Sequence, residues 1–212
     1  MATLDELGLK HQTDKSSSEH NYTWIYDRLF TSIREEPVEL LELGVWEGAS
    51  IAMWEEYFTH PDARIVGIDH VPRYHPAGLS SRVQLVHSDQ AEIPVELQDA
   101  TFDVIIDDAS HISSKTIASF LTWWPRLKQH GFYIVEDLMT SYYTDNPVEA
   151  NPDPEGQVPN VYGRTAMQWF KRMADQVNGW MIPAQYSVGA FDDLAAISFH
   201  PNMVIVTKAK TV

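Results

Sequence analysis

The stretch Val38-Glu-Leu-Leu-Glu-Leu-Gly-Val-Trp-Glu-Gly-Ala-Ser50 decides the fold class of this chain. It begins as a run of aliphatic residues, passes through a turn that contains Gly44 and Gly48, and continues with helical spacing to Phe58. The pattern predicts a buried strand over 38–45 and a helix over 50–58. A strand that enters a helix through a glycine turn is typical of the first unit of a doubly wound α/β sheet.

The rest of the chain repeats this alternation of short apolar runs and helical stretches. Strands are expected over 63–69, 82–87, 102–108 and 131–136, helices over 115–129 and 164–177, and a hairpin over 194–207 that turns at Pro201-Asn202. Apolar strands separated by helices indicate a parallel sheet that is covered on both faces. The sequence therefore predicts a doubly wound, mostly parallel seven-stranded sheet with a C-terminal antiparallel hairpin.

Two segments flank or interrupt this pattern. Residues 1–36 are polar and mixed, with helical spacing over 21–30, and Pro37 is expected to end that element. We therefore divide the chain into an N-terminal helical segment, residues 1–36, and one globular domain, residues 37–212. Residues 143–163 are rich in proline and poor in aliphatic side chains, which predicts a long loop or lid.

Composition excludes several classes of function. The 212 residues include 15 basic and 30 acidic side chains, a net charge of −15, so nucleic acid and anionic membranes are poor partners. No apolar run is long enough to span a membrane, and the N-terminus lacks the pattern of a signal peptide. The absence of cysteine excludes thiolate chemistry and disulfides. These features predict a cytoplasmic protein.

The first turn indicates which cofactor the sheet would bind. Its spacing is Gly-x-x-x-Gly rather than the Gly-x-Gly-x-x-Gly of dinucleotide sites. Glu42 would repel a pyrophosphate and attract a cation, and Asp69, at the end of the next strand, can accept hydrogen bonds from ribose hydroxyls. A cationic adenosine derivative without phosphates points to S-adenosylmethionine. The alternative is that the glycines make a tight turn and that Asp69 caps a helix.

Carboxylates also follow two later strands. Asp107 and Asp108 end one strand, Glu136 and Asp137 end the next, and His111 lies on the turn that leaves the first. Such carboxylates repel one another unless a cation binds them, and an all-oxygen site suits Mg²⁺. Asp107 and Asp108 should point to opposite faces. His111 could then act as general base for an acceptor hydroxyl. The alternative is ordinary turn and cap chemistry at both strand ends.

Several of these motifs occur together in one known group. Thr13-Asp-Lys15, His20-x-Tyr22, the glycine turn, Ile65-x-Gly-x-Asp69, Asp107-Asp-x-Ser-His111 and Val135-Glu-Asp-Leu138 resemble the metal-dependent sugar O-methyltransferases of natural-product biosynthesis, of the mycinamicin and demethylmacrocin O-methyltransferase type. The resemblance covers roughly residues 9–142. It implies a class I methyltransferase fold in which residues 1–36 form a lid.

The resemblance also implies a role for each matching residue. Asp108, Glu136 and Asp137 would bind Mg²⁺, and His111 would be the general base. The acceptor, a glycoside or diol, would contact Tyr142 and Tyr143. The residues expected to contact S-adenosylmethionine are Lys15, Tyr22, Glu42, Gly44, Gly48, Ser50, Asp69, Asp89, Gln90 and Asp107.

Departures from the family pattern leave alternatives open. Ala109 stands where the family usually has glycine, and the macrolide enzymes carry a long N-terminal domain that this sequence does not show. A homo-oligomer is expected from the family alone. Besides a sugar hydroxyl, a catechol or a polyketide vicinal diol would suit the same chemistry. A nicotinamide-dependent oxidoreductase and a non-catalytic binding module are the alternatives from other classes.

Overall fold

The computed structural model describes residues 1–71, 78–142, 165–177 and 191–209. The chain forms two compact units, residues 1–89 and residues 90–212. The predicted loop over 143–163 lies outside the described residues. The predicted division after residue 36 stays a prediction. The helices α1 (Leu4–His11) and α3 (Ala49–Tyr57), which lie on either side of residue 36, pack together within the first unit. Among the described residues, no helix has the length and hydropathy needed to cross a bilayer.

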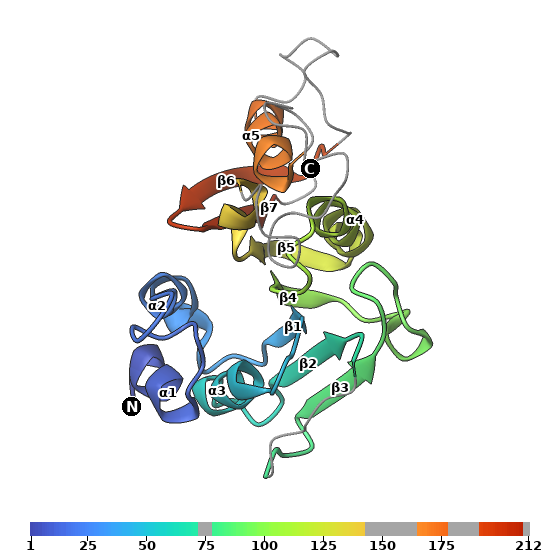
Figure 1. The fold of residues 1–212 in the computed structure, drawn as a ribbon. Coiled ribbons are helices and arrows are strands. Elements are labelled where there is room, and N and C mark those ends of the chain that lie inside the picture. The colour runs from blue at the N-terminus through green and yellow to red at the C-terminus, as the bar shows by residue number, and fades with distance from the viewer. Residues whose placement is uncertain (72–77, 143–164, 178–190, 210–212) are drawn as a thin grey trace. The chain divides into compact units, whose positions relative to one another are not determined.

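The first unit combines three parallel strands with three helices (Figure 1). The strand order is β3-β2-β1, with Leu41 opposite Val66 and Ile65 opposite Val83. Its elements are α1 (Leu4–His11), α2 (Thr23–Phe30), a 3-10 turn η1 (Thr31–Ile33), β1 (Glu39–Leu43), α3 (Ala49–Tyr57), β2 (Arg64–Asp69) and β3 (Val83–His87). All three predicted strands and the helix over 50–58 are therefore present.

Two details of the first unit differ from the expectation. The helix predicted over 21–30 ends at Phe30 and relaxes into η1, so it stops well before Pro37. The side chains of β3 are half-buried or exposed rather than fully buried, because β3 has a single neighbouring strand in this sheet.

The N-terminal helix α1 begins with a capping box, in which the Thr3 hydroxyl and the Glu6 carboxylate each accept a backbone N–H of the other residue.

Aromatic packing joins the helices of the first unit to each other. Tyr26 and Phe30 of α2 contact Trp54 of α3, with ring centroids 5.2 Å and 6.0 Å apart. Gly67 in β2 lets the glycine turn and α3 approach the sheet, since an added Cβ would lie 2.6 Å from a methyl group of Val45 in the turn and 3.0 Å from one of Ile51 in α3. The close approach holds the glycine turn against the carboxyl end of β2.

The second unit carries a mixed sheet in the order β4-β5-β7-β6. β4 and β5 are parallel, whereas β7 pairs antiparallel with both β5 and β6. Its elements are η2 (Val95–Leu97), β4 (Phe102–Asp107), α4 (Ser113–Trp123), η3 (Trp124–Arg126), β5 (Leu127–Val135), η4 (Leu138–Tyr142), α5 (Ala166–Gln176), β6 (Leu194–His200) and β7 (Met203–Lys208). The predicted C-terminal hairpin, with its turn at Pro201-Asn202, is confirmed.

The helix predicted over 115–129 is wrong at its C-terminal end. α4 ends at Trp123, Pro125 lies in the 3-10 turn η3, and β5 begins at Leu127 rather than at Gly131. Proline disfavours α-helix in the residue before it, which accounts for the early end. The apolar spacing of Phe120 and Trp124 continues through η3, and their stacked rings form part of the core under α5.

Candidate functional site

The turn between β1 and α3 has the left-handed backbone that its glycines predict. The φ angles are 88° at Gly44 and 81° at Gly48, and Trp46 between them is also left-handed at 50°. Glycine adopts this conformation without a steric penalty, whereas a Cβ opposes it. The Trp46 side chain is 64% exposed. The turn therefore presents backbone and one large aromatic ring at the carboxyl end of β1.

Asp69, the residue predicted to hold a ribose, fixes this turn from the end of β2. Its Oδ2 accepts the backbone N–H groups of Val45 and Trp46, each at 3.0 Å, and its Oδ1 accepts that of Val71 at 2.8 Å. Burial opposes ionisation of Asp69, but these hydrogen bonds outweigh it and lower its pKa. Asp69 is thus an anion that shapes the turn, a role that sequence reasoning did not assign to it.

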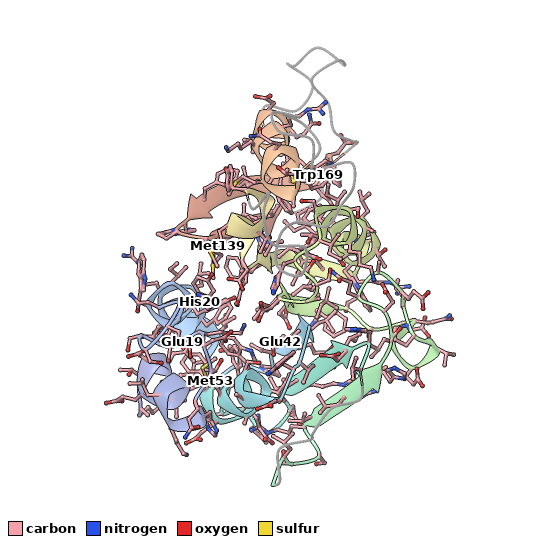
Figure 2. The ribbon with its side chains drawn as sticks, in the orientation of Figure 1. Glu19, His20, Glu42, Met53, Met139 and Trp169 are labelled. Atoms are coloured by element: carbon pink, nitrogen blue, oxygen red, sulfur yellow. The ribbon has the colours of Figure 1, made fainter. Side chains whose placement is uncertain are left out.

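Glu42 lies buried on β1 and is paired within the first unit (Figure 2). Its Oε2 accepts the Ser50 hydroxyl at 2.8 Å, and its Oε1 is 3.6 Å from Nζ of Lys15. The Lys15 and Glu42 side chains are 1% and 0% exposed. The negative charge that we expected to attract a cationic cofactor is therefore already compensated by an ammonium.

Lys15 is held by the loop that precedes α2. The Lys15 carbonyl accepts the backbone N–H groups of Tyr22 at 2.8 Å and Thr23 at 3.1 Å. Tyr22 is itself buried and stacks on His20, with ring centroids 5.2 Å apart. Lys15 and Tyr22, predicted to contact a cofactor, thus belong to one closed loop that ends beside Glu42.

In the second unit the structure brings together three of the predicted residues. Ligand atoms of Asp108, His111 and Asp137 all lie within 4.8 Å of one another, and we call these residues the acidic cluster. Nε2 of His111 is 3.7 Å from Oδ2 of Asp137, and both side chains remain partly accessible. A carboxylate pair and an imidazole at this spacing can bind one divalent cation.

Glu136, the third predicted metal ligand, does not belong to the acidic cluster. Its side chain is buried and its backbone N–H donates to the Asp107 carbonyl at 3.0 Å. Glu136 directly follows β5, and the left-handed backbone of Asp137, with a φ of 55°, ends the extended chain at that point. The predicted roles of Glu136 as a metal ligand and of His111 as a base stay predictions.

Both His111 and Asp137 have left-handed backbone, with φ angles of 56° and 55°. The Thr140 hydroxyl lies 3.1 Å from the His111 carbonyl and 2.9 Å from the Asp137 carbonyl, so it ties the two turns together. Non-glycine residues in this region store strain, which is common at functional sites. No motif in the sequence pointed to Thr140.

Asp107 diverges from Asp108, as predicted, and lies buried beside Gln90. The Gln90 amide donates to Oδ1 of Asp107 at 3.4 Å and to the Ser119 hydroxyl at 2.8 Å, and its oxygen accepts the Ser110 N–H at 3.2 Å. Burial, together with the charge of Asp108, raises the pKa of Asp107 to about 8 against the opposing hydrogen bonds. Gln90 thus joins Asp107 to α4, and its expected place beside adenine stays a prediction.

Among the residues described, Oδ2 of Asp107 and the hydroxyl of Tyr133 are buried oxygens without a hydrogen-bond partner in the second unit. Burial, followed by the nearby charge of Asp107, raises the pKa of Tyr133 well above its usual value. Buried polar atoms without partners are rare and suggest a missing ligand group. Sequence reasoning missed Tyr133, which looks like an ordinary aromatic residue of an apolar strand.

The remaining predicted residues are less engaged. Asp89 is half-buried at the end of the first unit, two residues beyond β3. Tyr142 is 58% exposed, and its hydroxyl accepts from Nζ of Lys171 at 3.2 Å. Tyr143 lies outside the described residues. No described contact therefore tests the predicted acceptor site.

Comparison with known proteins shows that the chain is similar to methyltransferases. Residues 41–138 match the family described as Methyltransferase domain. The L-olivosyl-oleandolide 3-O-methyltransferase of Streptomyces antibioticus is 34% identical over 82% of this chain and 46% of its own length. The 8-demethyl-8-alpha-L-rhamnosyl tetracenomycin-C 2'-O-methyltransferase of Streptomyces olivaceus is 31% identical over 97% of this chain and 54% of its own length.

A solved structure agrees with these matches. The methyltransferase MycE of the mycinamycin pathway, in complex with Mg, SAH and mycinamycin VI, has a TM-score of 0.80 and 27% identity, covering 99% of this chain and 54% of that one. The chain thus spans about half the length of these relatives. The predicted resemblance and fold class are confirmed. Residues 41–138 match a methyltransferase domain, the chain is similar to these sugar O-methyltransferases, and it has a class I, Rossmann-like fold.

Proposed function

We propose that this chain transfers a methyl group from S-adenosylmethionine to a sugar hydroxyl of a glycosylated polyketide or macrolide, and that it needs Mg²⁺ to do so. The observation that carries the proposal is the acidic cluster of Asp108, His111 and Asp137 on a methyltransferase fold. The relatives with this fold are named for methylation of olivosyl and rhamnosyl groups, and MycE was solved with Mg and SAH.

The first unit would hold the cofactor. Gly44 and Gly48 allow a ligand to approach the turn backbone, and Asp69 keeps that turn in place while its ionised carboxylate can still accept from a ribose hydroxyl. These features suit a cationic adenosine derivative better than a pyrophosphate.

The acidic cluster would orient and deprotonate the acceptor. Asp108 and Asp137 would hold a hard divalent ion, and the ion, when bound, would lower the pKa of an acceptor hydroxyl. His111 would then take the hydroxyl proton, and the oxygen would attack the methyl carbon as the carbon–sulfur bond breaks. Asp137, 3.7 Å from Nε2 of His111, would stabilise the resulting imidazolium.

Residues 1–36 would form a lid over the cofactor. The buried ion pair between Lys15 and Glu42 supports this proposal, because it anchors the segment to β1. Tyr142 and Tyr143 would face the acceptor. A homo-oligomer also remains part of the proposal, drawn from the family.

The test is a methyl-transfer assay with S-adenosylmethionine labelled in its methyl group. Olivosyl and rhamnosyl polyketides, their aglycones, and simple catechols would be the acceptors, each with Mg²⁺ or with EDTA. We expect label on the glycosides with Mg²⁺ and none on the aglycones. Label on catechols alone would mean that the acceptor is an aromatic diol and not a sugar hydroxyl. Methyl transfer that persists in EDTA would show that the reaction does not need the metal. Binding of NADH rather than S-adenosylhomocysteine would contradict the methyltransferase.

A further inference from the structure

Asn202, in the turn between β6 and β7, reaches the acidic cluster from a part of the chain to which no function has been assigned. Its Nδ2 donates to Oδ1 of Asp137 at 2.7 Å. Its Oδ1 accepts the backbone N–H of Met139 at 2.6 Å, and its carbonyl accepts that of Leu138 at 3.2 Å. The hairpin turn therefore holds the start of η4 at three points.

The orientation of the Asn202 amide follows from its partners. A backbone N–H can only donate, so the side-chain oxygen must face Met139 and the NH₂ group must face Asp137. This arrangement engages Oδ1 of Asp137 and leaves Oδ2 as the oxygen nearest His111, at 3.7 Å. The Asn202 amide thus determines which oxygen of Asp137 faces His111.

The backbone conformation at position 202 also favours asparagine. Asn202 has a φ of 60°, in the left-handed region where asparagine is tolerated better than most residues. Glycine would keep this turn but lose the amide, whereas most longer side chains would strain it. Asparagine satisfies both the turn and the hydrogen bonds to Met139 and Asp137.

We infer that Asn202 is a positioning residue that fixes the Asp137 carboxylate for cation binding. The inference rests on the proposed function, because it assumes that the acidic cluster binds a divalent ion. It goes beyond that function by assigning a part of the metal site to the C-terminal hairpin. Hydrogen-bonded partners of metal ligands orient those ligands, and their loss typically weakens metal binding about 10- to 100-fold.

The test is titration of the protein with Mn²⁺ alone, followed by electron paramagnetic resonance of the free ion, which needs no turnover. Asn202→Gly removes the amide and keeps the left-handed turn, and Asn202→Ala removes the same amide but strains the turn. His130→Gly is the matched control, because His130 is exposed and also left-handed, with a φ of 65°. A thermal melt accompanies each titration.

We expect both Asn202 variants to weaken Mn²⁺ binding about tenfold or more and to the same extent. Only Asn202→Ala should lower the melting temperature substantially, and if it fails to fold, Asn202→Gly still decides. His130→Gly should bind Mn²⁺ like the wild type. Wild-type affinity in folded Asn202→Gly would overturn the role of Asn202 alone. A wild-type protein that binds no Mn²⁺ would instead overturn the proposed metal dependence, and this inference with it.

Discussion

The glycine turn of the first unit and the acidic cluster of the second use the same backbone conformation for different ends. In the turn, two of the three left-handed residues are glycines, Gly44 and Gly48, and the third is Trp46. In the second unit, His111 and Asp137 of the cluster are left-handed, and so is Asn202, which donates to Asp137. Glycine takes this conformation freely, and an L-residue with a Cβ pays about 1 kcal/mol or more. The turn needs only exposed backbone. The cluster needs side chains at the same kind of corner, and hydrogen bonds from Thr140 and Asn202 offset the strain.

The largest expected effect comes from breaking the acidic cluster. Asp137→Asn should lower methyl transfer about a thousandfold, because several kcal/mol of transition-state stabilisation depend on the cation it would bind. Titration calorimetry should show S-adenosylhomocysteine affinity within a few-fold of the wild type. Asp103→Asn is the control, since Asp103 pairs with Lys128 at 2.9 Å outside the cluster. Equal loss of turnover and cofactor binding would contradict the assignment.

Next in size is the buried ion pair of the first unit. Lys15→Met leaves the Glu42 carboxylate buried without its ammonium, which should lower the free energy of unfolding by about 3 kcal/mol. Lys15→Met combined with Glu42→Gln should recover most of this loss in urea denaturation. The exposed pair of Lys10 and Glu56, 2.6 Å apart, provides the contrast, and Lys10→Met should change stability by less than about 1 kcal/mol. If Lys15→Met were as stable as the wild type, the Lys15–Glu42 pair would not anchor the N-terminal segment.

Removing the imidazole without disturbing the backbone should have a somewhat smaller effect. His111→Gly keeps the left-handed turn, so we expect unchanged stability with methyl transfer about a hundredfold slower. Single-turnover kinetics with labelled S-adenosylmethionine would measure the chemical step directly. Retained turnover would exclude His111 as base.

The smallest effect concerns the glycine turn itself. Gly48→Ala places a Cβ at a φ of 81° and should lower the free energy of unfolding by about 1 kcal/mol. Urea denaturation of this variant beside Asn202→Gly sharpens the comparison, because the second substitution relaxes a left-handed residue and should cost little. Equal losses would mean that the two corners do not differ in strain.

The sequence predicted most of the fold, because apolar strands and glycine turns are local signals that tertiary packing left in place. It missed the end of α4, where Pro125 stopped the helix although apolar spacing continued. In the candidate site, strand-end carboxylates and His111 were visible as a pattern. Which of them meet was not, because the direction of Glu136 and the contribution of Asn202 depend on the turn after β5 and on a hairpin 65 residues away from Asp137.

We propose that the cofactor is bound mainly by residues of the first unit and that the cation is bound by residues of the second unit. Calorimetric titration of S-adenosylhomocysteine into the wild type and Asp137→Asn, each with Mg²⁺ and with EDTA, tests it most directly. We expect S-adenosylhomocysteine to bind with micromolar affinity in all four titrations. We also expect methyl transfer to be lost in Asp137→Asn and in EDTA. No binding of S-adenosylhomocysteine to the wild type under either condition would contradict it.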